Sequence, residues 1–489
     1  MAGSVDPCKK MLFLDWRHIS CGFLDWVSPD GEKFAMGNPP GDPVEMHAAP
    51  VRVPHGIRLA AQPAQKTEPY SNWKGWGRTI YDSGVYRSWY MEINGIARLA
   101  TGAVSDLQNP SSVAICGVES SDGFNWSDPK RCEINIPGQH LFDGTTCFID
   151  PNAPESERYK FVYCAWPSEE IAERLFREYA VRRERYQQSR IMNGDRYCLF
   201  YCTSPDGIHW TPNPEPIMMH ASDTDTTIYW DSALQKYVLY TRMFREERRW
   251  IGRAEADTLS ELQWIEPVIW PRLDDPPDFD FYLNARSEYP GLSEYHLMFP
   301  TVWHRFTERS EIRLYSSADG IAWNQVPGGP VIEPGEPGEW DSEFICAGKD
   351  LAPFGNGRIA VPYIGTEYPH KYPRWQAVWD AWKVGWAWWP EDRLCAVTAD
   401  GEGEFFTIPS IPGGRTLRLN FRTPRGGEIR VGLAGVAGRS VDDCDPLHGD
   451  KMSQIVSWKG ETDIGVREGD PVALHIKLRC AELFALNWV

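Results

Sequence analysis

Three copies of one short motif constrain the fold of this 489-residue chain more than any other feature. They are "SSDGFNW" (120–126), "SPDGIHW" (204–210) and "SADGIAW" (317–323), each with Asp-Gly inside and a Trp at its end. Asp-Gly between apolar runs indicates a hairpin, because both residues tolerate the positive φ of tight turns. Strand-like segments precede each copy. We therefore interpret the motif as the hairpin between two outer strands of a repeated β unit, with a structural role for its Asp, Gly and Trp.

A second, weaker repeat lies upstream of these turns. It consists of an inner strand, a short loop and an aromatic-rich strand, and it occurs at 73–91, 143–163, 223–242, 280–300 and 340–365. The spacing of the starts leaves room for four strands in each unit. Repeats of this size that contain strands throughout predict a five-bladed β-propeller, here over residues 63–399.

The composition agrees with an all-β protein that has many turns. The chain contains 23 Trp, 20 Tyr and 20 Phe, which favour strands and also supply stacking surfaces for sugar rings. It also contains 42 Gly and 39 Pro. The formal net charge of −18 argues against nucleic acid or an anionic membrane surface as a partner. The oligomeric state is left open.

The cysteines and the N-terminus bear on the cellular compartment. The twelve cysteines follow no zinc-binding spacing, and Cys198 and Cys202 on one predicted strand lie roughly 13 Å apart, too far for a disulfide. The start "MAGSVDPCKKMLFLDW" contains no apolar run long enough for a signal peptide, and no later segment could span a bilayer. We expect a cytoplasmic protein with reduced thiols. An exported protein whose signal peptide has been removed is the alternative.

Three segments lie outside the repeat. Residues 168–190 are rich in helix formers, and the four-residue spacing of Ile171, Leu175 and Tyr179 predicts a surface helix inserted in the second blade. Whether this helix is a lid is left open. Residues 400–489 alternate apolar and polar positions over short runs between Gly-rich turns, which predicts a β-sandwich. Residues 1–62 are expected to pack on the propeller, with a strand near 11–16 that closes the ring.

The fourth unit gives the clearest signal for a functional site. In "DFDFYLNARSE" (278–288) the even positions are polar and the odd positions are mostly apolar. Because strand side chains alternate between faces, we expect the polar face to point into the central channel. An edge strand with a solvated face is the alternative. The polar positions are Asp278, Asp280, Tyr282, Asn284, Arg286 and Glu288.

The other units supply further candidate side chains, which we expect to converge with those of the fourth unit at one mouth of the channel. Candidates from the first, second, third and fifth units are Trp73, Trp76 and Arg78; His140 and Asp143; His220, Asp223 and Asp225; and Asp341 and Glu343. Carboxylates from several blades around one axis suit glycoside chemistry. In that chemistry one carboxyl group protonates the leaving oxygen, and another activates water or attacks the anomeric carbon.

The chain resembles the five-bladed propeller glycoside hydrolases of the invertase-like family 32 and the arabinanase-like family 43. It is most similar to a group of uncharacterised bacterial family-32-like proteins with a C-terminal β-sandwich. This resemblance is carried by "LFLDWRHI", "FIDPNAPESERYK" and "DDCDPLHGDKMSQIVSWKGETDI". The WxNDPNG, Arg-Asp-Pro and Glu-Cys-Pro motifs of the invertase-like enzymes are absent. The resemblance therefore implies a propeller glycosidase without implying a fructoside substrate.

The function that we expect is cleavage of a glycosidic bond in an oligo- or polysaccharide. Glu343 is the expected general acid and Asp143 the base or nucleophile, while Asp225 and Asp280 hold substrate hydroxyls. The expected substrate-binding residues are Trp73, Trp76, Arg78, His140, Asp223, Asp278, Tyr282, Asn284, Arg286, Glu288, His304 and Asp341. No cofactor and no metal are expected, and a structural cation in the channel is left open.

Two other functions remain compatible with these residues. A non-catalytic carbohydrate-binding propeller would use the same aromatic and polar side chains without paired acids at a set distance. A polysaccharide lyase would need a Tyr or His base beside a cation, for which the candidates are Tyr282, Arg286 and His304. The separation of the carboxyl groups distinguishes a hydrolase from a binding protein.

Overall fold

The structure is a computed structural model of the whole chain. It describes residues 7–27, 33–34, 47–70, 78–93, 113–134, 140–180, 198–220, 226–245, 247–262, 265–372 and 381–489. The chain forms two compact units. One consists of Met1–Gln62, Val326–Gly329 and Pro390–Val489, and the other of Pro63–Gln325 and Pro330–Trp389. The second unit contains the repeats.

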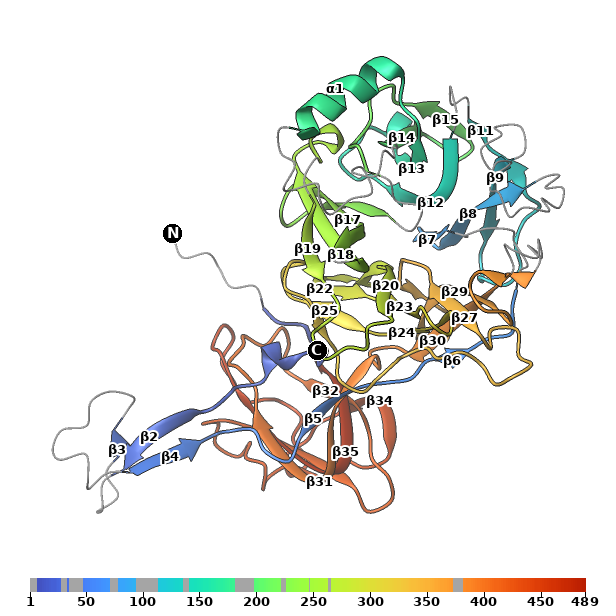
Figure 1. Cartoon of the computed structure of the whole chain (residues 1–489). Coiled ribbons are helices and arrows are strands. Elements are labelled where there is room, and N and C mark those ends of the chain that lie inside the picture. The colour runs from blue at the N-terminus through green and yellow to red at the C-terminus, as the bar shows by residue number, and fades with distance from the viewer. Residues whose placement is uncertain are drawn as a thin grey trace. The chain divides into compact units, whose positions relative to one another are not determined.

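The second unit contains successive groups of β-strands (Figure 1). The first group is a sheet of β7 (Arg78–Asp82), β8 (Val85–Ile93), β9 (Val113–Ser120) and β10 (Lys130–Arg131). The second is a sheet of β11 (Glu133–Ile134), β12 (His140–Ile149), β13 (Tyr159–Ala165), β14 (Cys198–Ser204) and β15 (His209–Pro212). The third is a sheet of β16 (Thr227–Asp231), β17 (Lys236–Arg245), β18 (Arg248–Ala256) and β19 (Glu266–Ile269). Antiparallel pairs dominate, and short turns join several of them, such as β7 to β8 and β16 to β17.

The fourth and fifth groups are less regular. The fourth has one sheet of β20 (Phe279–Leu283), β23 (Thr301–His304) and β24 (Arg309–Ile312) and another of β21 (Arg286–Tyr289), β22 (Leu292–Met298), β25 (Tyr315–Ser317) and β26 (Asn324–Gln325). The fifth is a sheet of β6 (Gln65–Lys66), β27 (Phe344–Ala347), β28 (Ala352–Pro353), β29 (Arg358–Thr366) and β30 (Lys383–Pro390). Its strand β6 precedes the other four groups in sequence.

The apolar core of the second unit lies between consecutive groups. Trp89 of the first group packs with Phe161 of the second, and Val162 of the second packs in one cluster with Leu239 of the third. The same holds between the third and fourth groups and between the fourth and fifth. Tyr86 of the first group then packs with Trp386 of the fifth. Each group therefore buries side chains against the group before it and the group after it.

The three sequence motifs form one and the same turn. In the copy at 204–210 the Ser204 hydroxyl accepts a hydrogen bond from the Gly207 N–H and donates one to Asp206. Asp206 also accepts the N–H groups of Ile208 and His209, and Trp210 Nε1 donates to the Gly207 carbonyl at 3.0 Å. The copies at 120–126 and 317–323 have the same bonds. The hairpin prediction is confirmed, and each motif glycine has a positive φ.

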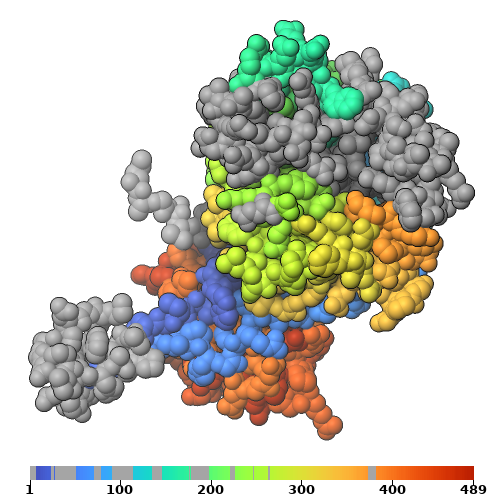
Figure 2. Space-filling model, in the orientation of Figure 1, coloured from blue at the N-terminus to red at the C-terminus, as the bar shows by residue number. Residues whose placement is uncertain are grey.

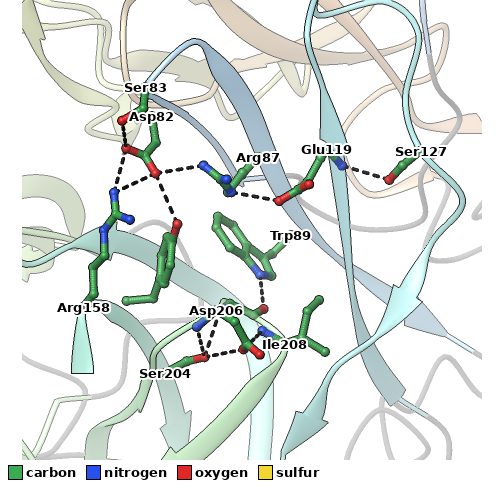
Figure 3. A network of polar contacts seen from close by, with 12 residues as sticks. Asp82, Ser83, Arg87, Trp89, Glu119, Ser127, Arg158, Ser204, Asp206 and Ile208 are labelled. Carbon is green, nitrogen blue, oxygen red and sulfur yellow. Dashed lines mark hydrogen bonds and ion pairs between the residues drawn. The ribbon is translucent and has the colours of Figure 1, made fainter. Parts of the chain in front are cut away.

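Each motif glycine also joins its group of strands to the preceding group. The Gly207 carbonyl accepts Trp89 Nε1 from the first group at 2.8 Å (Figure 3). The Gly320 carbonyl accepts the Tyr240 hydroxyl from the third group at 2.5 Å, and the Gly123 carbonyl accepts Trp386 Nε1 from the fifth at 2.9 Å. The last bond joins the end of the series to its start. The motif therefore sets both the turn and the contact between neighbouring groups.

A second repeated contact joins the groups near the C-terminal ends of their first strands. Asp82 at the end of β7 accepts Arg158 at 2.8 Å and the Tyr159 hydroxyl at 3.2 Å, both from the second group (Figure 3). Asp150, just after β12, accepts the Tyr237 hydroxyl of the third group at 2.8 Å. A buried carboxylate is thus satisfied by the next group of strands, which fixes the spacing between the groups.

Replacing Tyr240 with Phe tests the joining role of the motif. The change removes only the hydroxyl that donates to the Gly320 carbonyl, so we expect the free energy of unfolding to fall by about 1 kcal/mol. The matched control is Tyr372→Phe, because Tyr372 is 40% exposed and its change should have almost no effect. Urea unfolding of the three proteins measures both values. Equal effects of the two changes would contradict the joining role.

The predicted helix is present and lies between two strands of the second group. Helix α1 (Glu169–Ala180) follows β13, and residues 181–197 lie outside the described part of the chain. Leu175 is buried in the apolar cluster of the first and second groups, and Ile171 packs against it. Glu169, Glu170 and Glu173 face solvent, and Figure 2 shows the helix at the surface. The predicted insertion in the second repeat is confirmed.

The first unit is built around one long strand. It contains β1 (Lys10–Leu12), β5 (Arg58–Ala61), β31 (Cys395–Phe406), β32 (Leu417–Arg422), β33 (Glu428–Leu433), β34 (Asp450–Ile455) and β35 (Leu474–Trp488) in a sheet, and β2 (Phe23–Val27), β3 (Lys33–Phe34) and β4 (His47–Val51) in another. Where the sequence predicts short runs between turns, residues 474–488 form the single long strand β35. This strand pairs with β33 before Cys480 and with β32 after it. The two layers of a sandwich remain a prediction.

The N-terminal segment differs from its expected position. The strand predicted near 11–16 to close the propeller is β1, and it pairs instead with β35 of the first unit. The early strand that joins the fifth sheet is β6, which pairs with β30. All twelve cysteines are free, including Cys198 and Cys202. No helix in the described part of the chain is long and apolar enough to cross a membrane.

Candidate functional site

Asp280, one of the predicted acids, is held by two arginines. It lies in β20 and is fully buried. Its Oδ2 accepts Arg249 Nη1 from β18 and Arg305 Nε from the turn after β23, both at 2.7 Å. Its Oδ1 accepts the Arg249 N–H at 3.0 Å and Arg305 Nη2 at 2.9 Å. The hydrogen bond to Asp280 raises the pKa of Arg305. Asp280 therefore serves as a buried anion that joins the third and fourth groups.

Glu343 is the most accessible described carboxylate among the predicted catalytic acids. It directly precedes β27, and about a third of its side chain is exposed. Its Oε2 lies 3.2 Å from Arg309 Nε at the start of β24, and Arg309 Nη2 donates to the Ser342 carbonyl. A solvent-exposed ion pair of this kind is weak, so a ligand could replace it.

One hairpin binds both of these acids. Arg305 and Arg309 lie at the two ends of the turn from β23 to β24, which we call the 304–309 hairpin. Arg305 contacts Asp280 of the fourth group, and Arg309 contacts Glu343 at the start of the fifth. The structure therefore places two of the predicted acids near the N-terminal ends of β20 and β27, the first strands of neighbouring groups.

A mostly buried set of aromatic and basic side chains lies beside this hairpin. We call Arg242, Arg249, Tyr282, Trp303 and His370 the arginine–aromatic cluster. The rings of Tyr282, Trp303 and His370 lie 4.8–5.7 Å apart, and the Arg249 guanidinium lies 4.7 Å from the Trp303 ring. His370 also packs on Phe344, the residue after Glu343, at 4.4 Å. The cluster therefore packs beside the hairpin and against Phe344, the neighbour of Glu343.

Asp341 lies elsewhere in the fifth sheet. It is buried, and its Oδ2 accepts the Lys66 ammonium at 2.8 Å and the Tyr363 hydroxyl at 2.9 Å. Lys66 is in the edge strand β6, and Tyr363 is in the middle strand β29. Asp341 is therefore a structural anion of the fifth sheet, because its carboxylate joins the edge strand β6 to the middle strand β29.

The predicted polar face of 278–288 does not persist along the segment. Asp280 and Tyr282 share a face, and Phe279 and Phe281 pack on the other in the core between the third and fourth groups. After a register shift between Phe281 and Leu283, the chain bends at Ala285, which has a φ of 43°. The next strand, β21, pairs with β22 rather than β23. The expectation of one shared face is therefore wrong beyond Tyr282.

This bend separates the remaining candidates of the fourth group. Asn284 accepts the Thr227 hydroxyl at 2.9 Å, and Arg286 donates to Glu288 at 2.8 Å. His304 lies 3.8 Å from Glu311 and packs edge-on against Phe279. The four predicted residues of the fourth group from Asn284 onward, together with Asp278, are thus spread over several environments. Asp278 is half-buried, and its carbonyl accepts the Arg305 N–H at 2.9 Å.

The remaining candidates cannot be placed in this site. Trp73, Trp76, Asp223 and Asp225 lie outside the described residues. Arg78 is in β7, and His140 and Asp143 are in β12, but their side chains lie outside the described part of the structure. No group of three or more His, Cys, Asp or Glu among the described residues could hold a metal ion.

The sequence interpretation missed the basic residues of the site. Arg249, Arg305 and Arg309 are dispersed over three strands or turns, and nothing in their local sequence marks them as partners of acids. A usable signal is "WHRFTER" (303–309), in which two arginines flank a predicted turn between two strands. An arginine at each end of such a turn can reach a carboxylate of each neighbouring strand.

His220 supports the cluster from the third group. It is buried, and its Nε2–H donates to the Arg242 carbonyl at 3.0 Å, while Nδ1 has no hydrogen-bond partner among the described residues. Burial lowers the pKa of His220 to about 4. The imidazole is therefore neutral near pH 7, and a proton on Nδ1 would be buried without an acceptor.

The lowered pKa of His220 predicts a loss of stability at mildly acidic pH. The unfolded state takes up a proton near pH 6.5 and the folded state only near pH 4, so the contribution is complete above pH 6.5 and is lost as the pH falls toward 4. We expect a loss of roughly 2–4 kcal/mol over this window. His220→Gln keeps a donor and removes the titration. Urea unfolding at pH 7, 6 and 5 should show a weaker pH dependence in this variant, and an unchanged dependence would contradict the assignment.

No family model and no curated protein matches the sequence. In structure the chain is similar to an N-acetylgalactosamine deacetylase from F. plautii in complex with blood group B trisaccharide (14% identity, TM-score 0.43, 69% of this chain and 97% of that chain). It is also similar to an α-L-arabinofuranosidase from Podospora anserina in complex with cellotriose (11%, 0.41, 67% and 97%). A third is a fructofuranosidase from Schwanniomyces occidentalis complexed with fructosylnystose (10%, 0.38, 87% and 96%). At this identity and overlap, the similarity assigns neither a family nor an activity.

Proposed function

We propose that the chain is a glycoside hydrolase whose substrate binds where the first strands of its five strand groups begin. In this proposal the five groups are the blades of one β-propeller. The order of the groups supports it, because each packs on the next and the fifth packs on the first. In a propeller the first strands surround the central channel, so residues at their N-terminal ends lie around one mouth.

The observation that carries the proposal is the pair Asp280 and Glu343 on the two arginines of the 304–309 hairpin. Two acids from different groups form ion pairs with the same hairpin, and one of them, Glu343, is accessible to solvent. The hairpin links both acids, and Glu343, the accessible one, can supply the acid of the carboxyl pair that hydrolysis of a glycosidic bond requires. The arginine–aromatic cluster beneath it limits movement of Glu343.

In this mechanism Glu343 donates a proton to the leaving glycosidic oxygen. The substrate displaces Arg309 from Glu343, which leaves the carboxyl group of Glu343 facing the leaving oxygen. Asp143 of β12 is the proposed base or nucleophile on the other face of the sugar ring. Asp280 remains an anion and keeps Arg249 and Arg305 in place, a role that replaces the substrate contact expected from the sequence.

The test is a hydrolysis screen of the purified protein on a panel of aryl glycosides and plant oligosaccharides. We expect release of the aglycone from at least one member, with multiple turnovers per protein molecule. The anomer released first, followed by NMR, reports retention or inversion. Absence of turnover across the panel would contradict the hydrolase.

One observation favours a second function, a carbohydrate-binding propeller without activity. Each of Asp280, Asp341 and Glu343 lies in an ion pair with an arginine or a lysine. A protein that only binds sugars has no need for a free carboxyl group. Calorimetric binding of an oligosaccharide that is never cleaved would support this second function.

A further inference from the structure

A cavity lies near the C-terminal ends of the first strands, away from the acids and the 304–309 hairpin. Its volume is about 520 Å³, which is within the range of small-molecule sites. Each of the five strand groups contributes to its lining, and every lining residue is described. The lining includes the aromatic residues Tyr81, Tyr229 and Trp230 and the charged residues Arg286, Glu288 and Asp350.

Hydrogen bonds between the groups hold two residues of the cavity lining, Lys349 and Thr227. The Lys349 ammonium, buried after β27 of the fifth group, donates to the Cys147 carbonyl of the second group at 2.6 Å. In the order of packing, the first group lies between the fifth and the second. The Lys349 bond therefore joins two groups that are not neighbours in that order. The Thr227 hydroxyl donates to Asn284 at 2.9 Å, and Asn284 lies between Tyr282 of the arginine–aromatic cluster and Arg286 of the cavity. The lining includes none of Asp280, Glu343, Arg305 and Arg309 of the candidate active site.

Arg286 is a buried cation of the cavity lining that is held by several contacts. Its guanidinium lies flat on the Tyr229 ring, 3.4 Å from the centroid, and the side chain is almost entirely buried. Nη2 contacts Glu288 at 2.8 Å and His296 Nδ1 at 3.1 Å, while Nε has no hydrogen-bond partner among the described residues. Burial of an arginine with an unused donor is costly unless a ligand or water satisfies it.

The charges of the cavity balance. Arg286 pairs with Glu288, and Lys349 lies 3.6 Å from Asp350. Glu288 and Asp350 keep 40% and 37% of their side chains exposed, so their carboxylates can accept hydrogen bonds from a ligand. An anionic ligand would meet these two carboxylates, and a cationic ligand would meet Arg286 and Lys349. A neutral ligand with several hydroxyl groups fits the balanced charges best.

The aromatic residues favour a ring with an apolar face. Tyr81, Tyr229 and Trp230 line the cavity beside the polar groups, and each is at least partly accessible. A sugar ring presents C–H groups on its faces and hydroxyls on its rim, which matches aromatic walls and paired charges. We propose that this cavity is a second carbohydrate site, which binds a neutral sugar or cyclic polyol. The site does not depend on the proposed hydrolase activity.

Isothermal titration calorimetry tests the site with glucose, galactose, mannose, arabinose and fructose as neutral probes and glucuronate and glucosamine as charged ones. We expect saturable binding of at least one neutral sugar and weaker or no binding of the charged ones. The variants Asp350→Asn and Glu288→Gln keep the side-chain shape and remove the charge. Asn is also tolerated at position 350, where φ is 70°. Each should weaken binding at least about tenfold, whereas Asp257→Asn at an exposed position should not.

The same titrations in a Glu343→Gln background separate this site from the candidate active site. We expect both cavity variants to weaken binding equally in both backgrounds, and Asp350→Asn to leave hydrolysis unchanged. Absence of saturable binding by every neutral sugar would overturn the proposal. Binding of charged sugars alone, or sugar binding that the cavity variants do not alter, would also overturn it.

Discussion

Glu343→Gln is expected to lower kcat by at least about 100-fold on any glycoside that the parent protein cleaves. Gln keeps the shape of the side chain and removes the proton that the leaving oxygen requires, and general acid catalysis typically contributes this much. The matched control is Glu119→Gln. Glu119 is also an exposed glutamate paired with an arginine, Arg87, at 2.9 Å, but it lies in β9 of the first group.

The leaving group distinguishes an acid from other roles of Glu343. A dinitrophenyl glycoside needs little protonation to depart, so its cleavage should be much less sensitive to Glu343→Gln than that of an alkyl glycoside. A base or nucleophile would show similar losses with both substrates. The variant should unfold at the same urea concentration as the parent, because the ion pair with Arg309 is exposed. Unchanged activity on both substrates would refute the assignment.

Trp210→Ala is expected to lower the free energy of unfolding by about 3–5 kcal/mol, as for other buried large aromatic residues. Trp210 is 5% exposed and packs against Phe161 and Trp89, with ring centroids 5.5 and 6.4 Å away. Its loss leaves a cavity between the first and second groups. It also removes one of the two indole donors to the Gly207 carbonyl.

Trp126→Ala is the natural comparison for this variant. Trp126 is at the same position of the motif and donates to the Gly123 carbonyl at 3.1 Å, but it is only partly buried. Its replacement should cost less than that of Trp210, because less apolar area and packing are lost. Urea unfolding followed by circular dichroism gives both values. A loss for Trp126→Ala as large as that for Trp210→Ala would contradict burial as the cause.

The motif turns show which features are set by short stretches of sequence. In each copy the Ser, Asp and Trp bonds join residues within one seven-residue segment. The N–H and side chain of Asn125 lower the pKa of Asp122, so the turn favours the charged carboxylate at neutral pH. Helix α1 was predictable for a similar reason, because the spacing of Ile171 and Leu175 defines a single apolar face.

The site was only partly predictable, because its contacts join distant segments. Asp280 and Glu343 were identified by strand alternation and by their position at the start of a repeat. Their partners Arg249 and Arg305 come from other strands, and the positive φ of Ala285 ends the alternation on which the longer polar face was based. No local pattern reports such a bend, since the strand changes its pairing partner there.

The sequence by itself determined the repeated turns, the strand-rich composition and the inserted helix, because each depends on residues that are neighbours along the chain. Only the tertiary structure decided which charges pair, that Asp280 and Asp341 are structural anions, and that β1 joins the C-terminal strand β35. These outcomes depend on which strands lie side by side after folding. A buried charge must then be satisfied by whichever opposite charge or donor the neighbouring strand provides.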